Sequence, residues 1–442
     1  MAQPLTERLF ALRSRGSSVG REVLGGVTTY LTMVYIVFVQ PVVMAKAGMD
    51  FGAVTTATCL ASAIACFIMG LWANYPVALA PGMGSNFFFA LAVVVGMGFS
   101  WQEALGAVFV AGVAFLLVSL VGVRERIING LPEGIKAGIT AGIGLLIAFV
   151  GLQWSGLVVA KPGTLVGLGN LKDPVVLLGL GGLGIISLLL AWRVPGAILL
   201  GMLITAGIGA AVGMVSLKWG ISSPPSIKPV LFKMDFSALP HSFDLVVVAI
   251  TFFFLDMFDT IGTLVGIAPA AGLMKDGKLV GASRALTADS VGTIVGAAMG
   301  ISTITSYVES AAGIQAGART GLAAVVTGIL LCLTPFFYPV VEAIGAGVKG
   351  ASGLLHPVTA PVLIVVGVMM TGALRRVEWD KVSEAIPAFL TMIMMPMTLS
   401  ITEGISFGLI SYCVLALLTG RPRSVGGIMY LCAAVLLARY FL

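Results

Sequence analysis

Charged residues are the scarcest class in this chain. Only 10% of its 442 residues are Asp, Glu, Lys or Arg, whereas 58% are hydrophobic. A soluble domain carries about 25% charged residues, so this composition excludes an ordinary water-soluble protein. Apolar runs of about 18 to 25 residues recur along nearly the whole length, and such runs cross a bilayer as helices. The sequence therefore predicts an all-α polytopic membrane protein embedded in lipid.

Catalytic and metal-binding motifs are also lacking. The chain has two histidines and no HExxH, paired CxxC or P-loop pattern. The sequence therefore predicts no enzyme activity, no cofactor and no metal site. The net charge of +6 is assigned to basic cytoplasmic loops, so nucleic acid is not an expected partner. Five cysteines lie within apolar runs and are expected to be reduced packing residues: Cys59, Cys66, Cys332, Cys413 and Cys432.

The basic residues indicate how the chain is oriented. About 14 spans are predicted, and with a cytoplasmic N-terminus every arginine falls on the inner side, as the positive-inside rule requires. The expected location is the plasma membrane, which is the inner membrane in a Gram-negative bacterium. The longest polar connection, 216–242, contains several prolines and follows the seventh span. The chain thus divides into 7 + 7 spans, and an odd number per half makes the second half inverted, which is typical of transporters.

One span of the first half is interrupted. Within residues 75–90, Pro76 and Pro81 remove backbone donors and cannot continue a helix. Residues 77–80 are predicted to be extended. Ser85 and Asn86 are good N-cap residue types, so a helix is expected to begin there.

A span of the second half follows the same logic. Residues 302–308 are rich in β-branched and hydroxyl residues, which favours an extended stretch, and Ser310 suits a helix start. Each interrupted segment is the third of its half. Two half-helix N-termini facing each other would form a polar site at mid-membrane, because their free N–H groups carry partial positive charge. Ordinary proline or glycine kinks are the alternative.

Carboxylates within apolar spans are the strongest functional signal, because intramembrane acids are rare and usually functional. Asp256 and Asp259 lie in one such span, and Glu309 follows the extended stretch 302–308. Asp256 has an equally good structural interpretation, as an acid that packs helices through Ser or Thr. Asp289 is interpreted as a helix N-cap. Glu103, three residues after Ser100, is interpreted as part of a capping box.

Four long motifs occur in order along the chain: TTYLTMVYIVFVQP, VALAPGMGSNFFFA, FFFLDMFDTIGTLVG and TSYVESAAGIQAGARTGL. They resemble the AzgA-like purine permease branch of the nucleobase–ascorbate transporter superfamily (NCS2), and the resemblance covers nearly the whole chain. It implies a 7 + 7 inverted repeat in which the third and tenth spans are half strand and half helix. It also implies proton symport of a nucleobase by an elevator-like movement of a core domain against a gate domain.

The resemblance assigns segments to these domains. The core comprises 1–122 and 243–343, and the gate comprises 123–217 and 344–420. Residues 218–242 form an outer linker, and 421–442 form an apolar tail.

The resemblance also implies a binding site. Asp259 matches the span-8 acid that binds the base, Glu309 the span-10 acid and Asn86 the span-3 polar position. Phe87 falls where related uracil carriers place a stacking aromatic. AzgA-like proteins commonly read GMGLNAFF, so Ser85 and Phe87 are departures beside the expected pocket. Further hydroxyls are expected from Thr32, Thr260, Thr263 and Ser310.

The predicted function is import of adenine, guanine or hypoxanthine with protons. Glu309 is expected to hold the coupled proton, with Asp259 or Asp256 as the other candidates. The alternatives are a transporter of this fold for xanthine, uracil or an organic anion, and a non-accumulating channel. A homodimer is left open.

Overall fold

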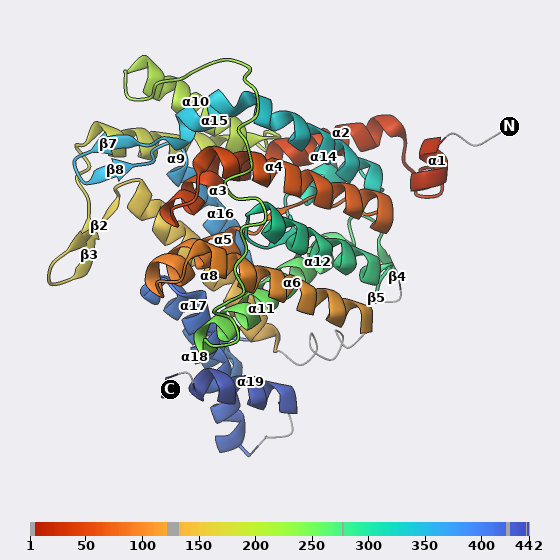
Figure 1. Cartoon of the computed structure of the whole chain (residues 1–442), viewed down its shortest axis with the longest axis vertical. Coiled ribbons are helices and arrows are strands. Elements are labelled where there is room, and N and C mark those ends of the chain that lie inside the picture. Colours follow the sequence, from red (N-terminus) through yellow and green to blue (C-terminus); the bar gives the residue numbers. More distant parts are fainter. Residues whose placement is uncertain (1–4, 122–131, 276–277, 421–424, 439, 442) are drawn as a thin grey trace.

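Helices make up most of this chain (Figure 1), for which a computed structural model describes residues 5–121, 132–275, 278–420, 425–438 and 440–441. Within these ranges, eight helical segments are long and apolar enough to cross a membrane: Val19–Lys46, Phe51–Ala73, Trp101–Leu120, Glu133–Trp154, Pro174–Ala191, Phe243–Ile267, Gly321–Gly345 and Ile401–Leu418. The other expected spans are built from shorter or less apolar helices. The prediction of a polytopic α-helical membrane protein is confirmed.

Two halves of similar element order follow each other along the chain. The first half contains α1 (Leu5–Phe10), α2 (Val19–Met33), α3 (Tyr35–Lys46), α4 (Phe51–Ile68), η1 (Met69–Ala73), β1 (Leu79–Pro81), α5 (Met83–Phe87), η2 (Phe88–Gly96), α6 (Trp101–Val121), α8 (Glu133–Trp154), β2 (Val158–Lys161), β3 (Leu165–Leu168), α9 (Pro174–Ala191) and α10 (Ala197–Ala211). The second half contains α11 (Phe243–Ile267), β4 (Met274–Lys275), β5 (Lys278–Leu279), α12 (Ala282–Met299), β6 (Ile304–Ser306), α13 (Ser310–Gln315), α14 (Gly321–Leu333), η3 (Thr334–Phe337), α15 (Tyr338–Gly345), β7 (Val348–Gly350), β8 (Gly353–Leu355), α16 (Ala360–Thr371), η4 (Gly372–Arg376), α17 (Val382–Thr398) and α18 (Ile401–Leu418), and α19 (Gly427–Ala438) follows.

The helices pack in two groups, each built from both halves. In the first group α2 packs on α13 and α14, α4 on α12 and α14, and α6 on α11 and α12. In the second group α8 packs on α16 and α17, and α9 packs on α10 and α16. The groups meet where α5 contacts α8 and where α2 contacts α10. Each group therefore combines corresponding segments of the two halves, as an inverted repeat requires.

Both predicted interruptions are present. Strand β1 precedes α5 in the first half, and strand β6 precedes α13 in the second. The two strands pair antiparallel, with Leu79 opposite Ser306 and Pro81 opposite Ile304. The observed strands are shorter than the predicted extended stretches 77–80 and 302–308, and β1 is displaced toward the C-terminal side of its stretch.

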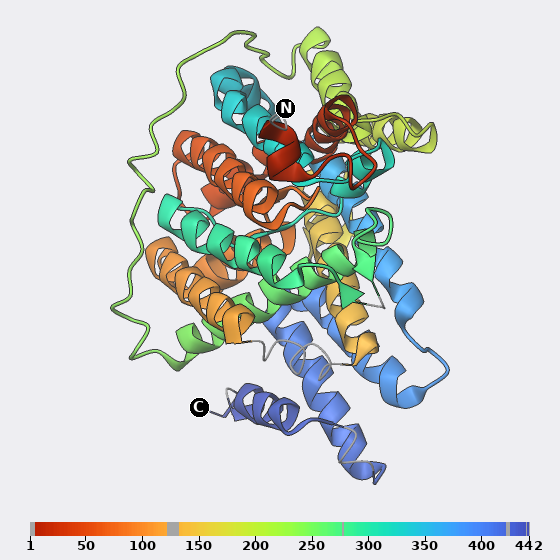
Figure 2. The same ribbon diagram turned by 90° about the vertical axis from the view of Figure 1, so that its right-hand side faces the viewer.

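Between α10 and α11 the chain has no regular structure, as predicted for residues 216–242. Figure 2 shows this segment running along one side of the molecule. Its backbone is held by the first helix group, because Phe232 donates to the carbonyl of Ala298 at 2.7 Å and Asp235 to that of Gln102 at 2.9 Å. The segment is therefore fastened to the outside of that group.

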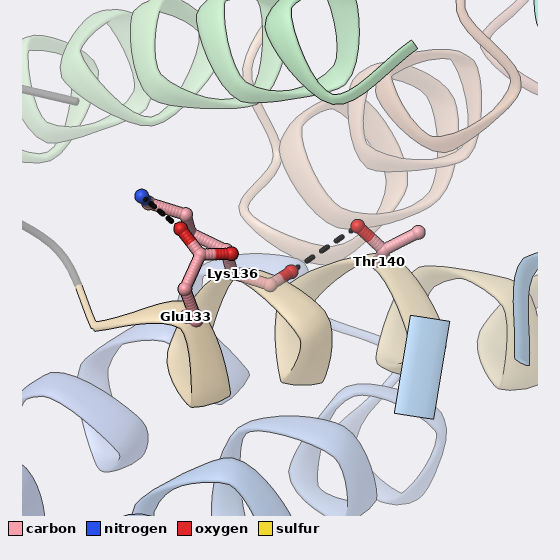
Figure 3. A network of polar contacts seen from close by, with 3 residues as sticks. All are labelled: Glu133, Lys136 and Thr140. Atoms are coloured by element: carbon pink, nitrogen blue, oxygen red, sulfur yellow. Dashed lines mark hydrogen bonds and ion pairs between the residues drawn. The ribbon is translucent and has the colours of Figure 1, made fainter. Parts of the chain in front are cut away.

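Local capping explains where several helices begin. At the start of α6, the Ser100 N–H donates to the Glu103 carboxylate at 2.8 Å and the Glu103 N–H donates to the Ser100 hydroxyl at 3.2 Å, so the predicted capping box is confirmed. Helix α8 begins with an ion pair of 2.8 Å between Glu133 and Lys136, and Thr140 donates to the Lys136 carbonyl (Figure 3).

The cysteines agree with the packing interpretation. Cys59, Cys66 and Cys413 are free and buried, and Cys332 is free and half-buried. The side chain of Cys432 lies outside the described part of the structure.

Candidate functional site

A polar centre surrounds the β1–β6 pair. Beyond the strand register, Tyr307 N–H donates to the carbonyl of Ala78, and Gly82 N–H donates to that of Thr303, both at 3.0 Å. Helix α5 starts directly after β1, and α13 starts four residues after β6. The N-terminal ends of two half-helices, one from each half of the chain, therefore flank one short strand pair.

Helix α5 begins earlier than expected. Its N-cap is Gly82 and its first residue is Met83, whereas the sequence predicted a start at Ser85–Asn86. The difference arises because the Ser85 hydroxyl is engaged inside the helix, where it donates to the Gly82 carbonyl at 2.9 Å and accepts from Thr303 at 2.7 Å. Tertiary contacts therefore override the N-cap preference of this residue.

Asp259 projects from the middle of α11 toward the start of α5. The Thr305 hydroxyl donates to Asp259 Oδ2 at 3.2 Å. A Cβ atom on Gly82 would lie 3.7 Å from the same oxygen, which places Asp259 beside the N-terminus of α5. Asp259 is half-buried.

Glu309 occupies the equivalent place at the second half-helix. It is the N-cap residue of α13 and is half-buried. Tyr35 donates its hydroxyl hydrogen to Glu309 Oε1 at 2.6 Å, and the Thr32 hydroxyl lies 3.4 Å from the Glu309 carbonyl oxygen. The side chain of Glu309 is thus oriented by the first span.

Asn86 and Phe87 are more enclosed than a ligand contact requires. Asn86 is fully buried, and its side-chain oxygen accepts a hydrogen bond from Ser302. Its Nδ2 has no hydrogen-bond partner among the described residues. Phe87 is 1% exposed, and its ring centroid lies 6.0 Å from that of Trp154 on α8. In this conformation Trp154 therefore covers the ring expected to stack on a base.

The remaining predicted hydroxyls differ in role. Ser310 accepts a hydrogen bond from the Ala78 N–H at 3.0 Å, which fastens α13 to the start of β1. Thr260 receives the Ser306 N–H at 3.2 Å and contacts the Thr305 hydroxyl at 3.1 Å. Thr263 is half-buried on α11, and within the described chain no hydrogen bond joins it to the site.

Asp289 is the residue that sequence reasoning misplaced. It is not an N-cap, because α12 begins at Ala282 with Gly281 as its cap. Its side chain is fully buried, and Oδ1 accepts hydrogen bonds from Thr260 at 2.7 Å and Ser306 at 3.2 Å. Its position within an apolar stretch was the signal that could have found it, since intramembrane acids are functional by default.

Asp256 belongs to the same buried network of hydrogen bonds. It is 2% exposed, and Oδ2 accepts from Thr293 at 2.7 Å. The same Thr293 hydroxyl accepts a hydrogen bond from the Ile304 N–H at 3.0 Å and lies 2.9 Å from the Ile304 carbonyl oxygen, a second possible acceptor for its single hydrogen. Asp289 therefore contacts strand β6 directly through Ser306, and Asp256 contacts it through Thr293. Asp259 and Glu309 flank the strand pair.

The site is acidic and has no compensating cation in the described chain. Among the described residues, ion pairs are formed by Lys136, Lys218 and Lys381. All three pairs lie away from the strand pair. Carboxylates can accept N–H donors, and the half-helix N-termini can donate to carbonyl or ring-nitrogen acceptors. The arrangement thus fits a neutral ligand that carries both donors and acceptors.

Comparison with known proteins identifies a matching family and several relatives. A profile of the Permease family (Xan_ur_permease) matches residues 20–407. The guanine/hypoxanthine permease PbuG of Bacillus subtilis is 46% identical over 95% of this chain and 96% of its own length. The adenine permease AdeP of Escherichia coli is 43% identical over 96% of this chain and 93% of its own length.

Solved structures support the architecture. The transmembrane domain of the cyanobacterial bicarbonate transporter BicA matches with a TM-score of 0.63 at 15% identity, covering 88% of this chain and 97% of that domain. At this identity the likeness concerns the fold alone, which is a 7 + 7 inverted repeat. Taken with the sequence profile and the relatives, the chain belongs to this permease family, the NCS2 family.

Proposed function

We propose that this protein imports purine nucleobases together with protons. The observation that carries the proposal is the placement of Asp259 and Glu309 beside the two half-helix N-termini, one carboxylate at each. Relatives that match more than nine-tenths of the chain are named guanine/hypoxanthine and adenine permeases. Adenine, guanine and hypoxanthine are neutral and carry N–H donors next to acceptor nitrogens or oxygens, which is the pattern that such a site complements.

The carboxylates and backbone take complementary roles in this proposal. Asp259 accepts a ring or exocyclic N–H of the base, and charge-assisted hydrogen bonds of this kind are the strong ones. The N–H groups at the start of α5 and α13 donate to acceptors of the base. Asn86 lies in the first turns of α5 and orients this end through its contact with Ser302. Thr263 lies one helical turn beyond Asp259 and is a further candidate for contacting the base.

Glu309 is proposed to carry the coupled proton. Glu309 is half-buried, and its carboxylate can bind a proton and can also contact the base. Asp259 and Asp256 are the other candidates for the coupled proton, because proton binding is shared within a group of interacting carboxylates.

Alternating access is proposed to arise from sliding of the two helix groups. The group containing α2–α6 and α11–α15 is the core, and the group containing α8–α10 and α16–α18 is the gate. An apolar cavity of about 180 Å³ lies between α11 on one side and α8, α18 and α19 on the other. Phe258, which directly precedes Asp259, lines this cavity. Such loose packing at the boundary favours movement more than an interlocked interface does.

Phe87 is proposed to stack on the base after this movement. Trp154 belongs to the gate and Phe87 to the core, so sliding separates their rings. The freed face of Phe87 would then be available to a planar ligand.

Anion transport is the main competing function, because the matching bicarbonate transporter shares the fold. Two half-buried carboxylates without an ion-pair partner in the described chain disfavour an anion. We also propose a plasma-membrane location with a cytoplasmic N-terminus. A homodimer is compatible with this arrangement.

The test is uptake of radiolabelled adenine, guanine, hypoxanthine, xanthine and uracil by cells that lack their own carriers, with and without a protonophore. Accumulation of a purine that collapses with the protonophore is the expected result. Uptake that stops at equilibrium would indicate a channel, and preference for xanthine or uracil would contradict the assignment to adenine, guanine or hypoxanthine.

The Glu309→Gln variant tests the proton role. We expect it to lose accumulation against a gradient, whereas the control Glu133→Gln, which changes an exposed glutamate paired with Lys136 (Figure 3), retains it. Protonophore-sensitive accumulation by Glu309→Gln would rule out Glu309 as the coupling residue.

A further inference from the structure

The first span is broken beside the site. Helix α2 ends at Met33 and α3 begins at Tyr35, with Val34 between them. Tyr35 is 1% exposed, and its hydroxyl donates to Glu309 Oε1 at 2.6 Å. The break therefore places the Tyr35 hydroxyl against Oε1 of Glu309, an acid that the sequence identified as a candidate site residue.

The surroundings hold Tyr35 in this orientation. Its ring lies 6.5 Å from the ring of Tyr307, centroid to centroid. The Tyr307 hydroxyl is itself engaged, because it donates to the Pro81 carbonyl at 2.6 Å. Thr32, one turn before Tyr35, lies against the Glu309 backbone carbonyl. The first span thus contacts both the side chain and the backbone of Glu309.

This contact makes the two oxygens of the Glu309 carboxylate inequivalent. Oε1 already accepts the Tyr35 hydrogen, and among the described residues no other side chain donates to this carboxylate. A carboxylate with both oxygens free can accept two adjacent donors at once, as it does from an arginine fork. Each oxygen has two lone pairs, so the Tyr35 hydrogen takes up half of the accepting capacity of Oε1 and weakens it, and Oε2 remains as the single strong acceptor.

We propose that Tyr35 is a specificity-determining residue that limits Glu309 to one N–H of the transported base. The inference rests on the proposed function and names what the site selects. Guanine presents its ring N1–H beside its exocyclic amino group, two parallel donors that match a free carboxylate. Hypoxanthine presents only N1–H on that edge. In the ionised form of Glu309, Tyr35 weakens Oε1 as an acceptor, reduces the advantage of guanine and lets Glu309 accept both bases alike.

The experiment compares guanine and hypoxanthine as competitors of labelled hypoxanthine uptake by the full chain. In the wild type we expect the two half-inhibitory concentrations to agree within about threefold. In Tyr35→Phe, which keeps the ring and frees Oε1, we expect guanine to improve over hypoxanthine by about tenfold, the effect of one additional charge-assisted hydrogen bond.

Tyr307→Phe is the matched control. It removes a phenolic hydroxyl of the same neighbourhood whose partner is a backbone carbonyl, so the ratio of the two bases should stay at the wild-type value. A purely structural role of Tyr35 would alter both affinities together and leave their ratio unchanged.

Three results would count against the inference in different ways. Purine uptake by the wild type with an unchanged guanine/hypoxanthine ratio in Tyr35→Phe overturns the role of Tyr35 alone. A wild type that already prefers guanine more than about tenfold also overturns it, even if Tyr35→Phe does not fold. A wild type that takes up neither base overturns the proposed function and this inference with it.

Discussion

Thr305 of strand β6 donates a hydrogen bond to Asp259 of helix α11 at 3.2 Å, and the same hydroxyl lies 3.1 Å from that of Thr260. A strand residue from one interrupted span therefore orients the acid of a neighbouring continuous helix. This contact links the strand pair directly to the proposed base-binding carboxylate.

The first prediction concerns this contact. Thr305→Val keeps the β-branched shape of a strand residue and removes the donor to Asp259. A hydrogen bond to a charged group contributes about 1.5–3 kcal/mol, so we expect the KM for purine uptake to rise about tenfold or more. Thr55→Val is the control, because that hydroxyl donates only to the Phe51 carbonyl within its own helix. An unchanged KM in Thr305→Val would show that Asp259 needs no orientation from β6.

A second prediction addresses Asp289, the buried acid that was wrongly interpreted as a helix N-cap from the sequence. Asp289→Leu leaves the hydroxyls of Thr260 and Ser306 without their acceptor in a buried environment. We expect the free energy of unfolding to fall by about 1–3 kcal/mol. Asp289→Asn retains one acceptor oxygen and should lose less. Thermal melting of the purified protein in detergent gives the comparison, and equal melting temperatures for Asp289→Leu and the wild type would contradict it.

Much of this site could be predicted from residue type and position. Asp259 and Glu309 stand out because carboxylates are rare in apolar spans, and the interrupted segments stand out through proline and β-branched residues. Asp289 was misinterpreted because a Ser/Thr-rich surrounding resembles a helix start when tertiary contacts are unknown. Tyr35 carried no signal at all, since its role depends on a helix break and on a glutamate far away in the sequence. The hairpins β2–β3 and β7–β8 were missed because their residues resemble ordinary loops.

The third prediction tests the aromatic proposed to stack on the base. Base–aromatic stacking contributes about 1–3 kcal/mol per base, so Phe87→Leu should raise the KM about fivefold to a hundredfold. Phe115→Leu is the control, because Phe115 is equally buried but lies on α6 against Phe253. If both variants keep the wild-type KM, Phe87 contributes packing against Trp154 and no contact with the base.

The fourth prediction concerns the close packing of α8 and α16, which we propose makes the gate group a rigid unit. A Cβ atom on Gly367 would collide with the Gly144 carbonyl oxygen and lie 2.6 Å from Ala148 Cβ. Both obstacles are backbone or the first side-chain carbon, so neither can rotate away, and overpacking of this kind costs about 1–3 kcal/mol. We expect Gly367→Ala to lower the melting temperature and the rate of transport.

Gly184→Ala separates this effect from the general consequences of replacing a helical glycine. Gly184 is exposed on α9, and a Cβ atom there meets no heavy atom within 4 Å. Alanine is the better helix former, so this control should melt at or above the wild-type temperature. A Gly367→Ala protein as stable as the control would mean that α8 and α16 can separate without penalty. In that case the gate would not be a rigid body, and movement of the core against it would have to be replaced by deformation within the gate itself.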